Sequence, residues 1–237
     1  MRTSNKVLAG LGAVIIVGLI LLIAVFRGFA GRVMKEKPEG TLISGSGNRR
    51  ERSYDIGGFS EIESSGDWEI KIVEGSEYAV RILAPENMFE VLRIDKEGDD
   101  LVLGVRPGYN LEHARLTAEI VMPRLEAVSA SGGISCRFSG FSGDRLDIEV
   151  SGGADIRGFG GRYENIGIDI SGAANVDLGD IETVNADVNL SGAGNIELTM
   201  DGGELTGGIS GAANLTYYGR VSRLEVEKSG LASISHE

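Results

Sequence analysis

One short phrase that begins with Ser-Gly returns six times between Ser131 and the end of the chain. Its copies start 20, 20, 20, 19 and 19 residues apart. A fixed period of about twenty residues, with short strands and no helical pattern, is typical of a β-solenoid in which each repeat forms one rung. The repeat therefore predicts an all-β fold whose rungs are each about 20 residues long.

Each Ser-Gly phrase follows a run in which apolar and polar residues alternate. Leu146, Ile148 and Val150 alternate with Asp147 and Glu149, and residues 166–170 and 186–190 repeat the pattern. Alternation of this kind predicts a strand with one buried face. A single rung buries too few side chains to offset the entropy of ordering its backbone, so we expect stability to come from stacking.

The phrase itself predicts a column of turns. Glycine adopts positive φ without steric penalty, and stacked asparagine amides can hydrogen-bond from one copy to the next. We interpret these residues as a structural turn ladder, with a ligand or metal column as the alternative. The ladder comprises Ser131, Ser151, Ser171, Ser191 and Ser210, then Gly152, Gly172, Gly192 and Gly211, and finally Asn175, Asn195 and Asn214.

Residues 45–237 are expected to form one domain, in which 45–124 is an irregular β part and 125–237 holds the regular rungs. In the irregular part, Ser65-Gly66 has the character of a degenerate copy of the later turns. Alternation and turn residues predict strands at Phe59–Ser64, Trp68–Val73, Tyr78–Leu83, Leu101–Val105 and Leu116–Met122.

The segment 7–26 is twenty residues long and carries no charge, which matches the thickness of a bilayer. We predict a tail at 1–6, a transmembrane helix or uncleaved signal anchor at 7–26 and a basic linker at 27–44, with a removed signal peptide as the alternative. Lys and Arg are more numerous after the segment than before it, which favours a cytoplasmic C-terminal side. The layout of a short tail, an anchor and a long β domain instead favours export. We expect a single-pass protein of the cell membrane with its β domain on the extracytoplasmic side.

Charge excludes one class of partner. The chain has a net charge of −12, and 17 acidic and 7 basic residues lie from Glu126 onward. Nucleic acid is therefore not an expected partner. Six outward carboxylates could form an acidic face for cations or a basic partner, or could simply be solvated: Asp147, Glu149, Asp169, Asp187, Glu225 and Glu227.

Cys136 is the only cysteine, and the two histidines, His113 and His236, are far apart in the sequence. We predict no catalytic, cofactor-binding or metal-binding residues and no cofactor.

The opening Gly45-Ser46-Gly47-Asn48, the segment Val80-Arg81-Ile82 and the Ser-Gly-Ala-Gly-Asn type of phrase together resemble the head GIN domain of putative auto-transporter adhesins. The resemblance covers about residues 45–237. It implies a right-handed β-solenoid and a surface or envelope setting, and it supplies no catalytic residues to carry over.

These features predict a membrane-anchored, cell-envelope protein that acts as a non-catalytic binding or adhesion module for an envelope glycan or protein. One alternative is a carbohydrate-active enzyme that uses Arg137, Arg157, Asp155 and Asp177. For a sugar, however, the repeats offer only Tyr163, Tyr217 and Tyr218 as aromatic platforms. A second alternative is an envelope scaffold that self-associates through its terminal rung.

Overall fold

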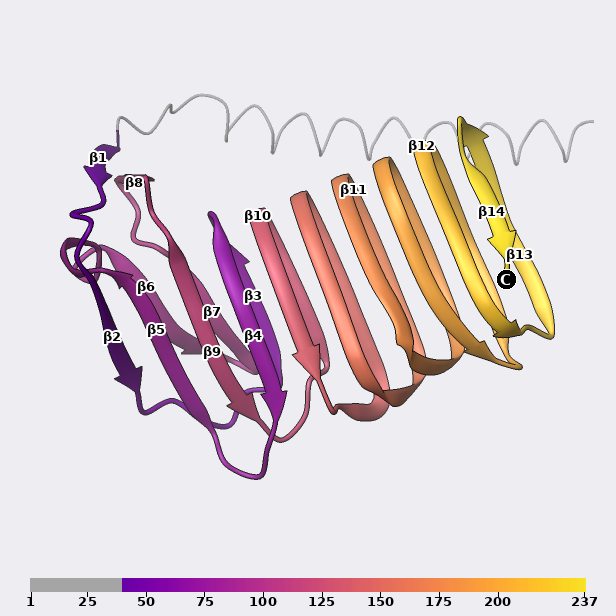
Figure 1. The fold of residues 1–237 in the computed structure, drawn as a ribbon, viewed down its shortest axis with the longest axis horizontal. Coiled ribbons are helices and arrows are strands. Elements are labelled where there is room, and N and C mark those ends of the chain that lie inside the picture. Colours follow the sequence, from indigo (N-terminus) through magenta and orange to yellow (C-terminus); the bar gives the residue numbers. More distant parts are fainter. Residues whose placement is uncertain (1–39) are drawn as a thin grey trace, which may run out of the picture. The chain divides into compact units, whose positions relative to one another are not determined.

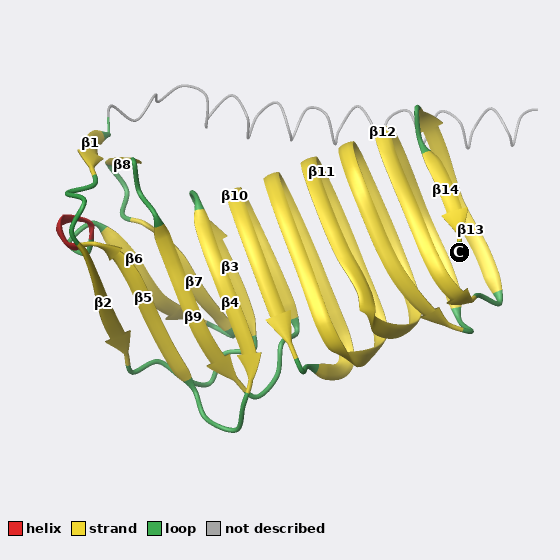
Figure 2. Ribbon diagram, in the orientation of Figure 1, coloured by secondary structure: helices red, strands yellow, loops and turns green. Residues whose placement is uncertain are grey.

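The computed structural model describes residues 40–237, and this part of the chain consists almost entirely of β-strands (Figures 1 and 2). A single turn of 3-10 helix, η1 (Glu86–Met88), follows Pro85. The strands are β1 (Thr41–Ser44), β2 (Arg49–Tyr54), β3 (Glu61–Ser65), β4 (Trp68–Glu74), β5 (Ala79–Pro85), β6 (Leu92–Glu97), β7 (Asp100–Val105), β8 (Tyr109–Glu112), β9 (Leu116–Met122), β10 (Ala127–Ser139), β11 (Ser142–Asp201), β12 (Glu204–Arg220), β13 (Arg223–Gly230) and β14 (Ser233–His236). Strands occupy all five of the segments that alternation predicted.

The repeats pair in parallel and in register. Ser131 of β10 lies opposite Ser151 of β11, and Ser210 of β12 lies opposite both Ser191 of β11 and Ser229 of β13. Figure 1 shows the successive turns of β11 side by side between β10 and β12. The in-register pairing that the repeat predicted is confirmed for these strands.

The N-terminal part is paired differently. β2 pairs with β5, β5 with β9, and β6 with β7, and all three pairs are antiparallel. β3 and β4 return to parallel pairing against β10. β1 and β8 form a separate two-stranded parallel sheet.

The predicted fold class is therefore wrong, although its all-β character is correct. The strands of the large sheet run in the order β13-β12-β11-β10-β4-β9-β5-β2, which is an open path with mixed pairing and not a closed right-handed β-solenoid over 45–237. The physical reason is local: β6 and β7 are joined by a tight turn at Gly98, which has φ 63° and reverses the chain.

The predicted transmembrane helix at 7–26 lies outside the described residues, as do the predicted tail and most of the linker. Within residues 40–237, no helix is long and apolar enough to cross a membrane.

The core follows the alternation that defined the strands. Leu146, Ile148 and Val150 are buried, and so are Ile166, Ile168 and Ile170 at the same positions of the next copy. Each such side chain contributes about 1.5–3 kcal/mol when it is removed from water. Because strand side chains alternate between faces, the intervening polar residues lie on the outer surface.

The turn glycines allow the backbones of neighbouring copies to come very close. A Cβ on Gly192, where φ is 146°, would lie 1.9 Å from the carbonyl oxygen of Gly172. Gly172 has the same relation to Gly152, at 2.1 Å. No side chain fits in such a gap, so glycine is required at this position of the repeat.

We predict that Gly192→Ala destabilises the protein by about 3 kcal/mol or more, because the added methyl group overlaps backbone atoms of the neighbouring copy. Urea unfolding measures the change. Gly202→Ala is the matched control, because Gly202 also has positive φ (90°) but has open space where its Cβ would stand. The control should lose only about 1–2 kcal/mol from backbone strain. Equal losses in the two variants would contradict the close-approach argument.

Candidate functional site

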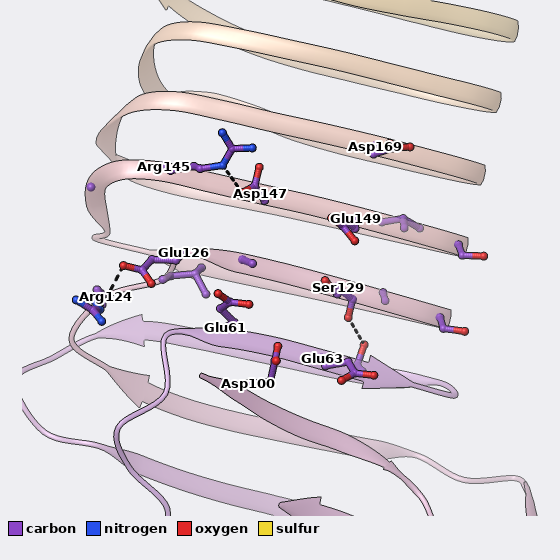
Figure 3. Close-up of a pocket in the computed structure, with 18 of the residues that line it drawn as sticks. Glu61, Glu63, Asp100, Arg124, Glu126, Ser129, Arg145, Asp147, Glu149 and Asp169 are labelled. Atoms are coloured by element: carbon purple, nitrogen blue, oxygen red, sulfur yellow. Dashed lines mark hydrogen bonds and ion pairs between the residues drawn. The ribbon is translucent and has the colours of Figure 1, made fainter. Parts of the chain in front are cut away.

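A groove with a volume of about 1150 Å³ opens on the outer face of β3, β10 and the first part of β11 (Figure 3). Carboxylates dominate its lining, and only two basic residues, Arg124 and Arg145, accompany them. The acidic residues of this groove are Glu61, Glu63, Asp100, Glu126, Asp144, Asp147, Glu149 and Asp169. We refer to this surface as the acidic groove.

Strand register assembles the carboxylates into two rows. In the first row, Ala127 of β10 lies opposite both Glu61 of β3 and Asp147 of β11, and Asp100 of β7 lies on the other side of Glu61. In the second row, Ser129 lies opposite both Glu63 and Glu149. Because β10 contributes only small side chains at these two positions, the surface is hollow between the acidic strands (Figure 3).

The two arginines of the acidic groove are already paired. Arg124 Nε lies 3.4 Å from Glu126 Oε1, and Arg145 donates a hydrogen bond to Asp147. The Ser60 hydroxyl also donates to Glu126 Oε2, at 2.6 Å. Within residues 40–237, Glu61, Glu63, Asp100 and Glu149 have no ion pair, so the groove retains a surplus of negative charge. This surplus attracts positively charged groups.

Glu61 experiences this crowding most strongly. Its pKa is raised above the usual value of a glutamate, first by partial burial and then by repulsion from the Asp100 carboxylate. Asp99, Glu126 and Asp147 contribute further repulsion in the same direction. A positive ligand in the groove would relieve this repulsion.

Three of the carboxylates of the predicted acidic face, Asp147, Glu149 and Asp169, line the acidic groove. The other three lie beyond it, further along the repeats. Asp187 of β11 lies opposite Thr206 of β12, and Thr206 lies opposite Glu225 of β13. Glu227 of β13 lies opposite Gly208 of β12. Sequence reasoning missed Glu61, Glu63 and Asp100. Aligning Glu61-Ile-Glu with Asp147-Ile-Glu, each just before a Ser-Gly turn, would have placed Glu61 and Glu63 in these rows.

The residues of the predicted turn ladder lie in columns at one side of the repeats. Ser131, Ser151 and Ser171 reach one end of the acidic groove. Asn195 donates from its amide nitrogen to Asn175 Oδ1 at 2.9 Å, and Asn214 donates to Asn195 Oδ1 at 3.0 Å. The glycines Gly152, Gly172, Gly192 and Gly211 all have positive φ. We propose a structural role for this ladder.

The residues considered for a carbohydrate-active enzyme do not gather in the groove. Arg157 pairs with Asp155 at 3.2 Å outside it. Tyr163 and Tyr217 are buried in the core, so they cannot serve as surface platforms for a sugar. Within residues 40–237, no group of three or more His, Cys, Asp or Glu side chains is arranged to hold a metal ion.

We predict that Asn195→Ala lowers the free energy of unfolding by about 1–2 kcal/mol, because it removes amide hydrogen bonds to the copies on both sides. Urea unfolding measures the loss. Asn189→Ala is the control, because the Asn189 amide donates only to Asp187 of the same copy. A loss no larger than that of the control would exclude a structural role for the ladder.

We also predict that Glu61→Gln raises the melting temperature by about 1–2 °C at pH 7, because it removes a carboxylate that its neighbours repel. Because the pKa of Glu61 is raised in the folded protein, ionising this carboxyl group costs more in the folded state than in the unfolded state. The stability that the protonated group allows is therefore complete below the unfolded pKa, and it is lost as the pH rises through the folded pKa. The gain in the variant should therefore vanish below the ordinary glutamate pKa. Calorimetry at pH 7 and at acid pH checks this, and an equal gain at both pH values would contradict it.

Three solved structures share the fold. A putative adhesin from Bacteroides fragilis is 16% identical, with a TM-score of 0.65 over 82% of this chain and 100% of that one. A putative lipid binding protein from Parabacteroides distasonis is 16% identical, with a TM-score of 0.55 over 83% of this chain and 100% of that one. A putative adhesin from the same species is 15% identical, with a TM-score of 0.53 over 83% and 100% of the two chains. Comparison with curated proteins gave no match.

A family profile matches residues 58–221, and its description is putative auto-transporter adhesin, head GIN domain. This description suggests a non-catalytic binding role and a surface location. The match covers more than half of the chain and confirms the resemblance seen in the sequence. The chain therefore belongs to the head GIN domain family of putative auto-transporter adhesins.

Proposed function

We propose that the chain is a non-catalytic binding module of the cell envelope that uses the acidic groove to hold a positively charged ligand. The observation that carries the proposal is that four carboxylates of the acidic groove, Glu61, Glu63, Asp100 and Glu149, have no basic partner within residues 40–237. These four side chains line one groove on a paired, in-register sheet, so their positions are held by the backbone of four strands.

Electrostatics supports a ligand of opposite charge. A concave surface lined by one sign of charge concentrates oppositely charged groups and speeds their association. The pKa of Glu61 is raised first by partial burial and then by repulsion from neighbouring carboxylates, and a cationic ligand would relieve that repulsion. Amino groups of an envelope polymer or a basic patch on a protein both have this chemistry.

The proposal includes the membrane anchor expected from the sequence. The uncharged segment 7–26 would hold the β domain at the membrane, on its extracytoplasmic side. The family description and the layout of tail, anchor and β domain support this placement. Labelling of an introduced cysteine by a membrane-impermeant reagent in intact cells tests it, and protection of residues 45–237 from that reagent would contradict it.

Binding to a fluorescent nonalysine peptide tests the groove, with the full chain held in zwitterionic detergent. We predict that the double variant Glu63→Gln with Glu149→Gln weakens binding at least tenfold, because it removes two unpaired carboxylates. Binding of the unmodified chain should also weaken as NaCl is raised, since exposed charges are screened.

The double variant Glu225→Gln with Glu227→Gln is the matched control, because it removes the same charge outside the groove. The control should bind within twofold of the unmodified chain. Equal weakening in both variants would show that the carboxylates are only a solvated charged face, and absence of binding to nonalysine would overturn the proposal.

The self-associating scaffold is a second candidate, and the C-terminal strands favour it. β13 pairs only with β12, and Leu224 and Leu231 are 45% and 86% exposed near this edge of the sheet. Unpaired edges with apolar side chains are templates for a further strand. Lys228, however, lies opposite the buried Ile209, and a charge at such a position opposes edge pairing. Light scattering that shows a mass rising with concentration would favour the scaffold.

A further inference from the structure

We propose that a second hollow, separate from the acidic groove, is a binding site for a neutral saccharide. It lies between the Ser65–Asp67 turn that joins β3 to β4, strand β8, and the start of β9. Its volume is about 440 Å³, within the range of about 300–1,000 Å³ that is usual for small-molecule pockets. It shares no lining residue with the acidic groove.

The hollow combines an apolar floor with a polar rim. Val105, Leu111, Ala114 and Leu116 are buried or half-buried and supply the floor. The exposed rim carries one carboxylate, one amide, one phenol and one imidazole, which belong to Asp67, Asn110, Tyr109 and His113. A few converging polar groups over an apolar surface are the usual composition of a small-molecule site.

Three of the four polar groups of the rim are available to a ligand, whereas His113 Nδ1 lies 3.8 Å from Glu112 Oε2. Within residues 40–237, the side chains of Asp67, Tyr109 and Asn110 make no hydrogen bond or ion pair with the protein. The position of Asp67 depends on Gly133 of the next strand, because a Cβ on Gly133 would lie 2.3 Å from Asp67 Oδ1. The packing of the repeats therefore leaves room for this carboxylate.

His113, in the loop between β8 and β9, has an unfavourable backbone conformation. His113 has φ 53° and is the only non-glycine residue with positive φ within residues 40–237. The N–H of Gly45 donates to the Glu112 carbonyl at 3.0 Å, and a Cβ on Gly45 would lie 2.8 Å from the His113 carbonyl oxygen. Pairing of β1 with β8 thus holds the imidazole at the rim, and residues in such conformations gather at ligand sites.

This set of groups matches a saccharide better than other small ligands. A sugar ring presents hydroxyl groups, which pair with a carboxylate and an amide, and an apolar C–H face, which packs on an aromatic ring. Tyr109 is 40% exposed and offers that ring. Asp67 and the adjacent Glu112 disfavour an anionic ligand, so the sugar should carry no acidic group.

Saturation-transfer difference NMR on the full chain tests the site, with N-acetylglucosamine, galactose and mannose as probes and glucuronic acid as the anionic comparison. At least one neutral sugar should bind at millimolar concentration. Tyr109→Ala should weaken that binding at least tenfold, and Asp67→Asn at least threefold.

Phe159→Ala is the matched control, because Phe159 is equally exposed, at 41%, and lies outside this hollow. It should leave sugar binding unchanged, and equal urea midpoints for all variants should show that the fold is kept. Failure of all three neutral sugars, stronger binding of glucuronic acid, or equal loss in Phe159→Ala would overturn the proposal.

This inference rests on the proposed binding role only in part, because the ligand and the site are both different. The double variant Glu63→Gln with Glu149→Gln should lose nonalysine binding and keep sugar binding. If the unmodified chain binds a neutral sugar but not nonalysine, the proposal for the acidic groove is overturned. If it binds nonalysine but no neutral sugar, the proposal for the second hollow is overturned.

Discussion

The structure depends on the close approach of neighbouring backbones at the turn glycines. A Cβ on Gly192 would lie 1.9 Å from the Gly172 carbonyl oxygen. Only glycine at this position therefore allows successive copies to lie at strand-pairing distance. This contact also sets the register, because every copy must place its glycine at the same level. A slip of one residue would turn the apolar face outward and the carboxylates inward.

Register has opposite energetic consequences on the two faces of the strands. On the inner face, Ile148 and its equivalents stack into a buried core that stabilises the fold. On the outer face, the same register brings Glu61, Asp100 and Asp147 near one another, and partial burial together with repulsion from these carboxylates raises the pKa of Glu61. The outer face thus holds an arrangement of carboxylates that does not stabilise the fold.

The N-terminal strands give the domain features that the repeats alone do not provide. Parallel pairing of β7 with β3 brings Asp100 next to Glu61 and so completes the acidic groove. The β1–β8 pair holds the connection after Glu112 and shapes the second hollow. The acidic groove lies where the first repeats meet β3 and β7, whereas the second hollow is lined only by residues of the N-terminal part.

Alternation and the Ser-Gly period by themselves determined five of the N-terminal strands and the in-register pairing of residues 127–230. They also determined the outward position of Asp147, Glu149 and Asp169, since these features follow from local geometry. The family was also evident from the sequence. Only the tertiary structure decided that the sheet is open and mixed, that Tyr163 and Tyr217 are buried, and that Asp100 joins the groove. These outcomes depend on which strands become neighbours across 39 or more residues. Apart from the degenerate copy at Ser65-Gly66, the irregular N-terminal part carries no repeat that would specify such neighbours.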